Sequence, residues 1–165
     1  MKAFVSLLCG VLTSFQLASA AHAACLIELA TYADKDKVAE INFTPSQGGA
    51  TVANTFRMLL GNDVVLDGIV QWTEGVARSY GMLTHKCPDG DVTGEEYAAC
   101  TVWQGVIYAS DDQGNITLMP NEGVAAPRRL IFADLGPALR NAQAFGPKGL
   151  EKLPFDVFEM NGCQE

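Results

Sequence analysis

The chain has 165 residues, of which 19 are acidic and 11 basic, so its formal net charge at pH 7 is −8. A charge of this sign repels phosphate backbones, which excludes nucleic acid as an expected partner. The length suits one domain with a single hydrophobic core, and no apolar run after residue 23 is long enough to predict a membrane span.

The first 23 residues have the three-part pattern of a cleavable secretory signal peptide. Lys2 supplies the positive charge, an apolar run follows from Ala3 to Leu12, and two small-residue cleavage motifs end at Ala20 and Ala23. The apolar run is shorter than the roughly 20 residues of a membrane-spanning helix. We place cleavage after Ala23, with Ala20 as the alternative. The pattern therefore predicts a periplasmic or secreted protein.

Removal of residues 1–23 would leave a single disulfide-bonded domain of residues 24–165. Lys2 would leave with the signal, so 10 of the 11 basic residues would face 19 acidic ones, a net charge of −9. Cys9 would also leave, and an even number of cysteines in an exported chain indicates disulfides. The four that stay are Cys25, Cys87, Cys100 and Cys163.

Three disulfide connectivities are open, and we favour Cys25–Cys163 with Cys87–Cys100. The first bridge would join the two ends of the domain, and the second would close a short, turn-rich loop. A zinc site that combines His85 with cysteines is the competing interpretation, but the chain lacks the paired C-x-x-C spacing that such sites use.

Alternation of apolar and polar residues dominates the first half of the chain and predicts strands. Residues 26–44 are ambiguous, because their pattern fits a hairpin that turns at 33–36 as well as a helix. Residues 52–83 predict three antiparallel strands joined by two short turns, the third beginning at Val76. The apolar faces of the first two strands are Val52, Asn54, Phe56, Met58 and Leu60, followed by Val64, Leu66, Gly68, Val70 and Trp72.

The second half predicts a loop from Cys87 to Glu96, a long strand over 97–110, and a hairpin turn at 111–115. Its further elements are a returning strand at 116–119, a short strand at 130–133, a helix near 134–145 whose N-cap is Asp134, and a last strand at 155–158. The expected fold class is mainly β, α+β at most: an antiparallel β sandwich or small barrel of about eight short strands, with one late helix and two disulfides.

The acidic stretch after Cys87 resembles the front half of a calcium-binding loop. The first, third, fifth and seventh positions are occupied by Asp89, Asp91, Thr93 and Glu95, and these are the candidate metal ligands. The twelfth position, where a bidentate Glu normally closes such a loop, is Cys100. A solvated acidic loop clipped by a disulfide is the alternative, and calcium is the one cofactor that the pattern suggests.

Catalytic patterns are weak in this sequence. His85 is the one histidine of residues 24–165, and we expect it at the surface, too far along the strand from Ser79 to contact it. Asp67 and Glu74 flank the strand that carries Trp72 and are the candidate carboxylate pair for a hydrolase. Trp72 and Trp103 lie on apolar faces, so we expect both to pack in the core.

The function that these features favour is a non-catalytic binding or inhibitory module of the cell envelope, whose partner is a protein or a small envelope ligand. A structural or assembly component of the envelope is one alternative, and a hydrolase that uses paired carboxylates is another. The expected contacts with a basic partner are Glu96 in the acidic loop and Asp111 and Asp112 in the hairpin turn.

Overall fold

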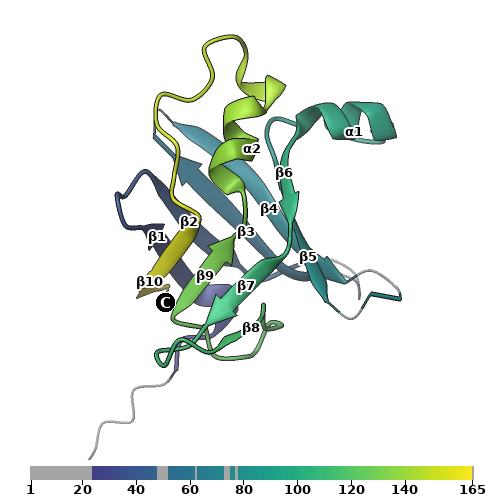
Figure 1. Cartoon of the computed structure of the whole chain (residues 1–165). Coiled ribbons are helices and arrows are strands. Elements are labelled where there is room, and N and C mark those ends of the chain that lie inside the picture. Colours follow the sequence, from purple (N-terminus) through teal and green to yellow (C-terminus); the bar gives the residue numbers. More distant parts are fainter. Residues whose placement is uncertain (1–23, 48–51, 62, 73–74, 77, 165) are drawn as a thin grey trace, which may run out of the picture.

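The computed structural model describes residues 24–47, 52–61, 63–72, 75–76 and 78–164, and shows one curled antiparallel sheet with two α-helices (Figure 1). The predicted signal peptide, Asn62 in the first turn of the meander and Glu74 lie outside the described residues. Within the described part of the chain, no helix has the length and apolar character that a membrane crossing requires.

Ten strands form the sheet in the order β6-β5-β4-β3-β2-β1-β10-β9-β7-β8. They are β1 (Ala30–Asp34), β2 (Ala39–Thr44), β3 (Val52–Leu60), β4 (Val64–Trp72), β5 (Ser79–Thr84), β6 (Thr101–Gly105), β7 (Ile107–Ser110), β8 (Ile116–Leu118), β9 (Arg129–Phe132) and β10 (Val157–Cys163). The mainly β, antiparallel class is thus confirmed. The sheet is a single curled half-barrel and not two stacked sheets.

The ambiguous N-terminal segment is a hairpin, preceded by the short 3-10 helix η1 (Ile27–Leu29). The Asp34 carboxylate fixes its turn, because Oδ1 accepts a hydrogen bond from the Ala39 amide at 2.7 Å and Oδ2 accepts one from the Asp36 amide at 3.2 Å. Lys37 takes a left-handed conformation with φ 52°. The hairpin interpretation is therefore confirmed and the helical one is wrong.

The central meander of β3, β4 and β5 is confirmed, with antiparallel pairing throughout. The predicted inward positions from Asn54 to Leu60 are buried, as are Leu66, Gly68 and Val70. The third strand begins at Ser79 and not at Val76, which is 45% exposed. Trp103 is buried as expected. Trp72 is the last residue of β4 and is partly exposed, and its Nε1 donates a hydrogen bond to Asn121 Oδ1 at 3.2 Å.

A helix occupies the place where the predicted loop passes into the predicted long strand. This helix, α1 (Gly94–Cys100), begins with a capping box: Thr93 Oγ1 accepts a hydrogen bond from the Glu96 amide, and the Glu96 carboxylate accepts one from the Thr93 amide. Such a box satisfies two backbone donors that a helix start leaves unpaired. The predicted strand over 97–110 is therefore wrong in its first four residues.

The curl of the sheet depends on the segment Thr101–Ser110, which serves both ends of the sheet. Its first part, β6, pairs with β5, and its second part, β7, pairs with β9 (Figure 1). Trp103 spans the space left between β6 and the end of β9, where its Nε1 donates to the Ala133 carbonyl oxygen at 3.0 Å. One continuous segment thus brings the two ends of the sheet together.

Aromatic rings fill the concave side of the sheet. Phe43 and Phe56 are 5.1 Å apart between ring centroids, and Phe132 lies 5.9, 5.3 and 5.4 Å from Phe56, Trp103 and Phe158 respectively. Gly68 provides the space for one of these rings, because a Cβ at this position would overlap the side chain of Phe56. A continuous aromatic core therefore supports the curvature.

The late helix, α2 (Leu135–Asn141), covers the open end of the curled sheet and buries Leu135 and Leu139 (Figure 1). The predicted cap by Asp134 is wrong, since this residue has a left-handed backbone at φ 59° and its side chain makes no capping bond. The Asp156 carboxylate accepts hydrogen bonds from the amides of Asp134 and Gly136 instead. A residue 22 positions away thus performs the expected role.

Both predicted disulfides are present. Cys25 bonds to Cys163, with 5.8 Å between their Cα atoms, and Cys87 bonds to Cys100, with 5.2 Å. The first bridge lies at the end of the β1–β10 pairing, in which Ala30 faces Cys163. It therefore fastens the first and last strands of the domain to each other.

The two disulfides should differ in their effect on stability. They close loops with sequence separations of 138 and 13 residues, for which the chain-entropy model gives about 5 and about 3 kcal/mol. We expect the Cys25→Ala/Cys163→Ala variant to lose more free energy of unfolding in urea than the Cys87→Ala/Cys100→Ala variant. An equal or reversed order would contradict this account of the bridges.

The space at Gly68 yields a second prediction. Gly68→Ala should lower the free energy of unfolding by about 1–3 kcal/mol, because the added methyl group displaces the Phe56 ring. Gly61→Ala is the matched control, since a Cβ there meets nothing within 4 Å. If thermal unfolding shows the same change for both variants, ring packing at Gly68 is not what the glycine provides.

Candidate functional site

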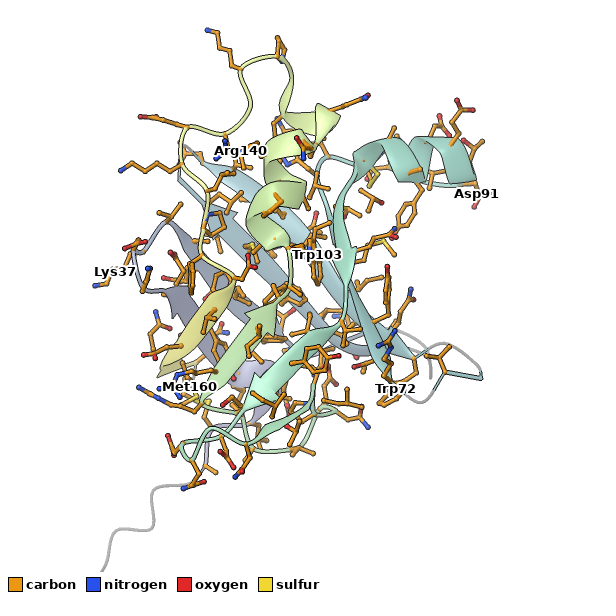
Figure 2. All side chains as sticks on the ribbon, viewed as in Figure 1. Lys37, Trp72, Asp91, Trp103, Arg140 and Met160 are labelled. Carbon is orange, nitrogen blue, oxygen red and sulfur yellow. A yellow bond between two sulfur atoms is a disulfide. The ribbon has the colours of Figure 1, made fainter. Side chains whose placement is uncertain are left out.

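The most distinctive surface feature is an acidic arm, defined as residues 87–100, which contains α1 and projects from the rim of the curled sheet (Figure 1). Its carboxylates are exposed, and Asp91 lies at its outer end (Figure 2). Within the described part of the chain, the side chains of Asp89, Asp91 and Glu95 make no hydrogen bond or ion pair. These three charges are therefore available to a partner.

The arm is attached to the sheet at its root. The Cys87–Cys100 disulfide closes it, and the His85 amide donates a hydrogen bond to the Cys100 carbonyl oxygen at 2.8 Å. An open hollow of about 340 Å³ lies at this root and is lined by His85, Lys86, Pro88, Glu96, Ala99, Cys100 and Ala144. The root thus combines a fixed backbone with a concave surface beside the acidic side chains.

His85 belongs to the support of this root and not to the surface. It is only 8% exposed, its ring lies 5.2 Å from the Phe145 ring, and its Nδ1 is 3.1 Å from the Val65 carbonyl oxygen. The prediction of a surface histidine is therefore wrong. Phe145 comes from η2 (Gln143–Phe145), 60 residues further along the chain, which local sequence patterns cannot reveal.

Ser79 lies at the opposite end of β5 from His85, in agreement with the expectation that the two do not meet. Its hydroxyl is buried without a hydrogen-bond partner among the described residues, as are both amide atoms of Asn54. Each unpaired buried polar group costs about 1–3 kcal/mol. This end of the interior is therefore less favourable to stability than the aromatic core.

Electrostatics at Glu96 follow from the capping box. The amide of Thr93 and then its hydroxyl donate hydrogen bonds to the carboxylate and hold the pKa of Glu96 below its usual range. A lowered pKa in the folded state stabilises the fold above the usual pKa of a Glu, and this contribution is lost as the pH falls through the lowered value. Glu96, predicted as a partner contact, thus also holds the helix.

The calcium pattern maps onto the arm in two parts. Asp89 and Asp91 lie in the exposed loop, whereas Thr93 is the helix N-cap and uses its hydroxyl in the capping box. No group of three or more His, Cys, Asp or Glu side chains gathers in a metal-binding arrangement among the described residues. Calcium binding by Asp89, Asp91, Thr93 and Glu95 stays a prediction.

The other predicted contacts, in the β7–β8 turn, already have partners within the chain. The Asp111 carboxylate accepts hydrogen bonds from the amides of Gln113 and Asn115 and from Asn115 Nδ2, and Asn115 holds the pKa of Asp111 below its usual range. Asp112 Oδ1 lies 3.9 Å from Arg128 Nε. The acidic arm is therefore the stronger candidate surface.

The carboxylates considered for hydrolysis are separated from Trp72 by the geometry of the strand. Side chains of β4 alternate between the two faces of the sheet, and Asp67 and Trp72 are on opposite faces. Asp67 points outward, where its Oδ1 lies 3.5 Å from Arg57 Nε, and Trp72 is on the inward face. Glu74 lies outside the described residues. Among the residues that the structure describes, no carboxylate pair lies beside this tryptophan.

Sequence reasoning missed the helix of the arm although a local signal exists. Thr93 and Glu96 have the spacing of a capping box immediately before Tyr97, but the alternation from Tyr97 onward favoured a strand.

No protein-family model matches this chain, and neither curated proteins nor solved structures show significant similarity to it.

The capping box predicts a measurable titration. Thr93→Val removes the hydroxyl bond to Glu96 but keeps the backbone one, so the pKa of the Glu96 carboxyl should move upward toward its ordinary value. Thr117→Val is the control, because Thr117 is exposed in β8, away from the arm. Side-chain NMR titration measures both, and an unchanged Glu96 pKa in Thr93→Val would count against the box.

Proposed function

We propose that this protein is a non-catalytic binding module of the cell envelope, and that its acidic arm holds a basic segment of a partner protein. The observation that carries the proposal is the set of exposed, unpaired carboxylates of Asp89, Asp91 and Glu95 on a projecting helical arm (Figure 2). Carboxylates that are not used inside the chain attract cationic side chains without loss of internal ion pairs.

The way the arm is held supports this role. A disulfide, a capping box and the His85–Cys100 hydrogen bond constrain the arm before any partner arrives. Pre-organisation of this kind reduces the conformational entropy lost on binding. A flexible acidic loop would have to be ordered by its partner at a cost in affinity.

The hollow at the root of the arm provides a concave surface next to the acidic side chains. Pro88, Ala99 and Ala144 give it an apolar wall, and Glu96 lines it together with one cation, Lys86. A basic residue with a long aliphatic stem fits both properties, since such side chains bury the stem and keep the charged head near carboxylates. We therefore propose lysine or arginine as the residue that enters the hollow.

A periplasmic or extracellular location belongs to the same proposal. Disulfides persist in oxidising compartments, and the arm depends on one of them for its closure. The export pattern of residues 1–23 agrees with that location.

The test compares two variants of equal charge. The arm variant, Asp89→Asn/Asp91→Asn/Glu95→Gln, removes three unpaired carboxylates, and the control, Asp36→Asn/Glu40→Gln/Asp63→Asn, removes three exposed carboxylates elsewhere. With hexalysine as a defined probe at low salt, the arm variant should bind about tenfold more weakly than the wild type, since three exposed ion pairs contribute about 0.5 kcal/mol each. The control should change binding less than twofold.

Crosslinking in envelope extract, followed by mass spectrometry, then asks whether the natural partner uses the same surface. A protein recovered with the wild type and the control but lost with the arm variant supports the proposal. Recovery that is equal with all three proteins, or equal loss of hexalysine binding in both variants, rejects the arm as the binding surface.

A further inference from the structure

A second charged surface, opposite in sign, lies away from the arm and plays no part in the proposed function. We define it as the basic rim, made of Lys37 in the β1–β2 turn, Arg140 at the end of α2, and Lys148 and Lys152 in the segment before β10. In Figure 2, Lys37 and Asp91 lie on opposite sides of the molecule, with Arg140 on the end that carries α2. The rim and the arm are therefore separate surfaces.

Two adjoining hollows are bordered by the rim. The larger, of about 580 Å³, includes Arg140 and Lys148, and the smaller, of about 250 Å³, includes Lys37 and Lys152. Both are lined by Leu150 and Glu151, which therefore form the ridge between them. Each hollow thus has two cationic side chains of its own.

The charge of this surface is contrary to that of the chain as a whole. Four cations and two carboxylates, Asp36 and Glu151, line the two hollows, so their formal charge is +2 in a chain of net charge −8. Lys35 in the same turn adds another cation, with its Nζ 4.5 Å from the centroid of the Phe155 ring. Like charges gathered in this way repel each other unless an anion lies between them.

The rim cations also differ from three of the four arginines elsewhere among the described residues, the exception being the exposed Arg78. Arg57, Arg128 and Arg129 make salt bridges with Asp67, Asp112 or Glu159. Among the described residues, the side chains of Lys37, Arg140, Lys148 and Lys152 make no salt bridge or hydrogen bond, and all four are exposed. Their charges are therefore open to a ligand.

We propose that the basic rim is a binding site for a ligand with two phosphate groups, held by the cations that line the two hollows. Three of the four cations are lysines, which bind phosphate as compact point charges, and Arg140 adds a planar donor for phosphate oxygens. A phosphate carries up to two negative charges and therefore neutralises more of the excess positive charge of the site than a single carboxylate ligand does. The charge of the whole chain disfavours a long polyanion, so the ligand is small or is a lipid headgroup.

The experiment separates these two sources. Titration calorimetry at low salt measures binding of inorganic pyrophosphate, with orthophosphate as the single-group comparison. Co-sedimentation with cardiolipin vesicles, whose headgroup holds two phosphates, and with phosphatidylcholine vesicles tests the lipid source. Pyrophosphate should bind at least about tenfold more tightly than orthophosphate, because its second phosphate group adds charge-assisted contacts with the rim cations.

Variants locate the binding. Lys148→Gln/Lys152→Gln removes one cation from each hollow. It should weaken binding of pyrophosphate or of cardiolipin vesicles, whichever of the two the wild type binds more tightly, by about tenfold or more. Arg57→Gln/Arg78→Gln removes two exposed cations elsewhere and should change binding less than twofold. Both pairs are at exposed positions, and thermal unfolding checks that the variants fold.

Each outcome decides the proposal. Rim-dependent binding of pyrophosphate supports a soluble diphosphate ligand, and rim-dependent binding of cardiolipin vesicles alone supports a lipid headgroup. Binding to neither probe, or equal weakening by both variants, overturns the proposal. The arm variant described above leaves the rim intact, so failure of the basic-partner proposal and failure of this one are distinguishable.

Discussion

The constraint on which the rest of the structure depends is that one segment, Thr101–Ser110, belongs to both ends of the sheet. Its first part pairs with β5 and its second with β9, so the sheet must curl for both pairings to form. Trp103 fills the space where the two pairings diverge, with its Nε1 bonded to the Ala133 carbonyl. The start of this segment sets where α1 projects, and its end sets where the β7–β8 hairpin lies. The position of the acidic arm is therefore a consequence of this closure.

Curvature also explains why the core is aromatic. Large rings fill the concave side with few residues, and Phe132 alone contacts Phe56, Trp103 and Phe158. The same packing requires a residue without a side chain at Gly68. The Cys25–Cys163 bridge then holds β1 against β10, halfway along the order of strands, where no turn connects the two. Packing and covalent closure thus act at different points of the same sheet.

Features that depend on local pattern were predictable from the sequence, and features that depend on distant contacts were not. Alternation identified the inward residues of β3 and β4, and the positions of the cysteines indicated their pairing. Alternation failed at Tyr97–Cys100, because the capping box of Thr93 and Glu96 outweighed it. A local pattern cannot predict contacts between distant residues. It therefore did not predict that Asp156 accepts the hydrogen bonds at the start of α2, or that the Phe145 ring packs against His85. The basic rim combines residues between positions 37 and 152 that are far apart in the sequence, so no sequence motif could predict it.

The distribution of charge, rather than its total, carries the functional information. A net charge of −8 on its own indicates solubility and avoidance of polyanions. The structure divides that charge into an arm with unpaired carboxylates and a rim with unpaired cations, whereas the arginines of β3 and β9 pair with carboxylates on neighbouring strands. These pairs are exposed, so each contributes at most about 1 kcal/mol to stability. Exposed charges without a salt bridge or hydrogen bond also occur elsewhere on the described surface, as at Glu40 and Arg78. Two external ligands of opposite sign are therefore favoured by the hollows beside the arm and the rim together with their charge, and not by the lack of pairing alone.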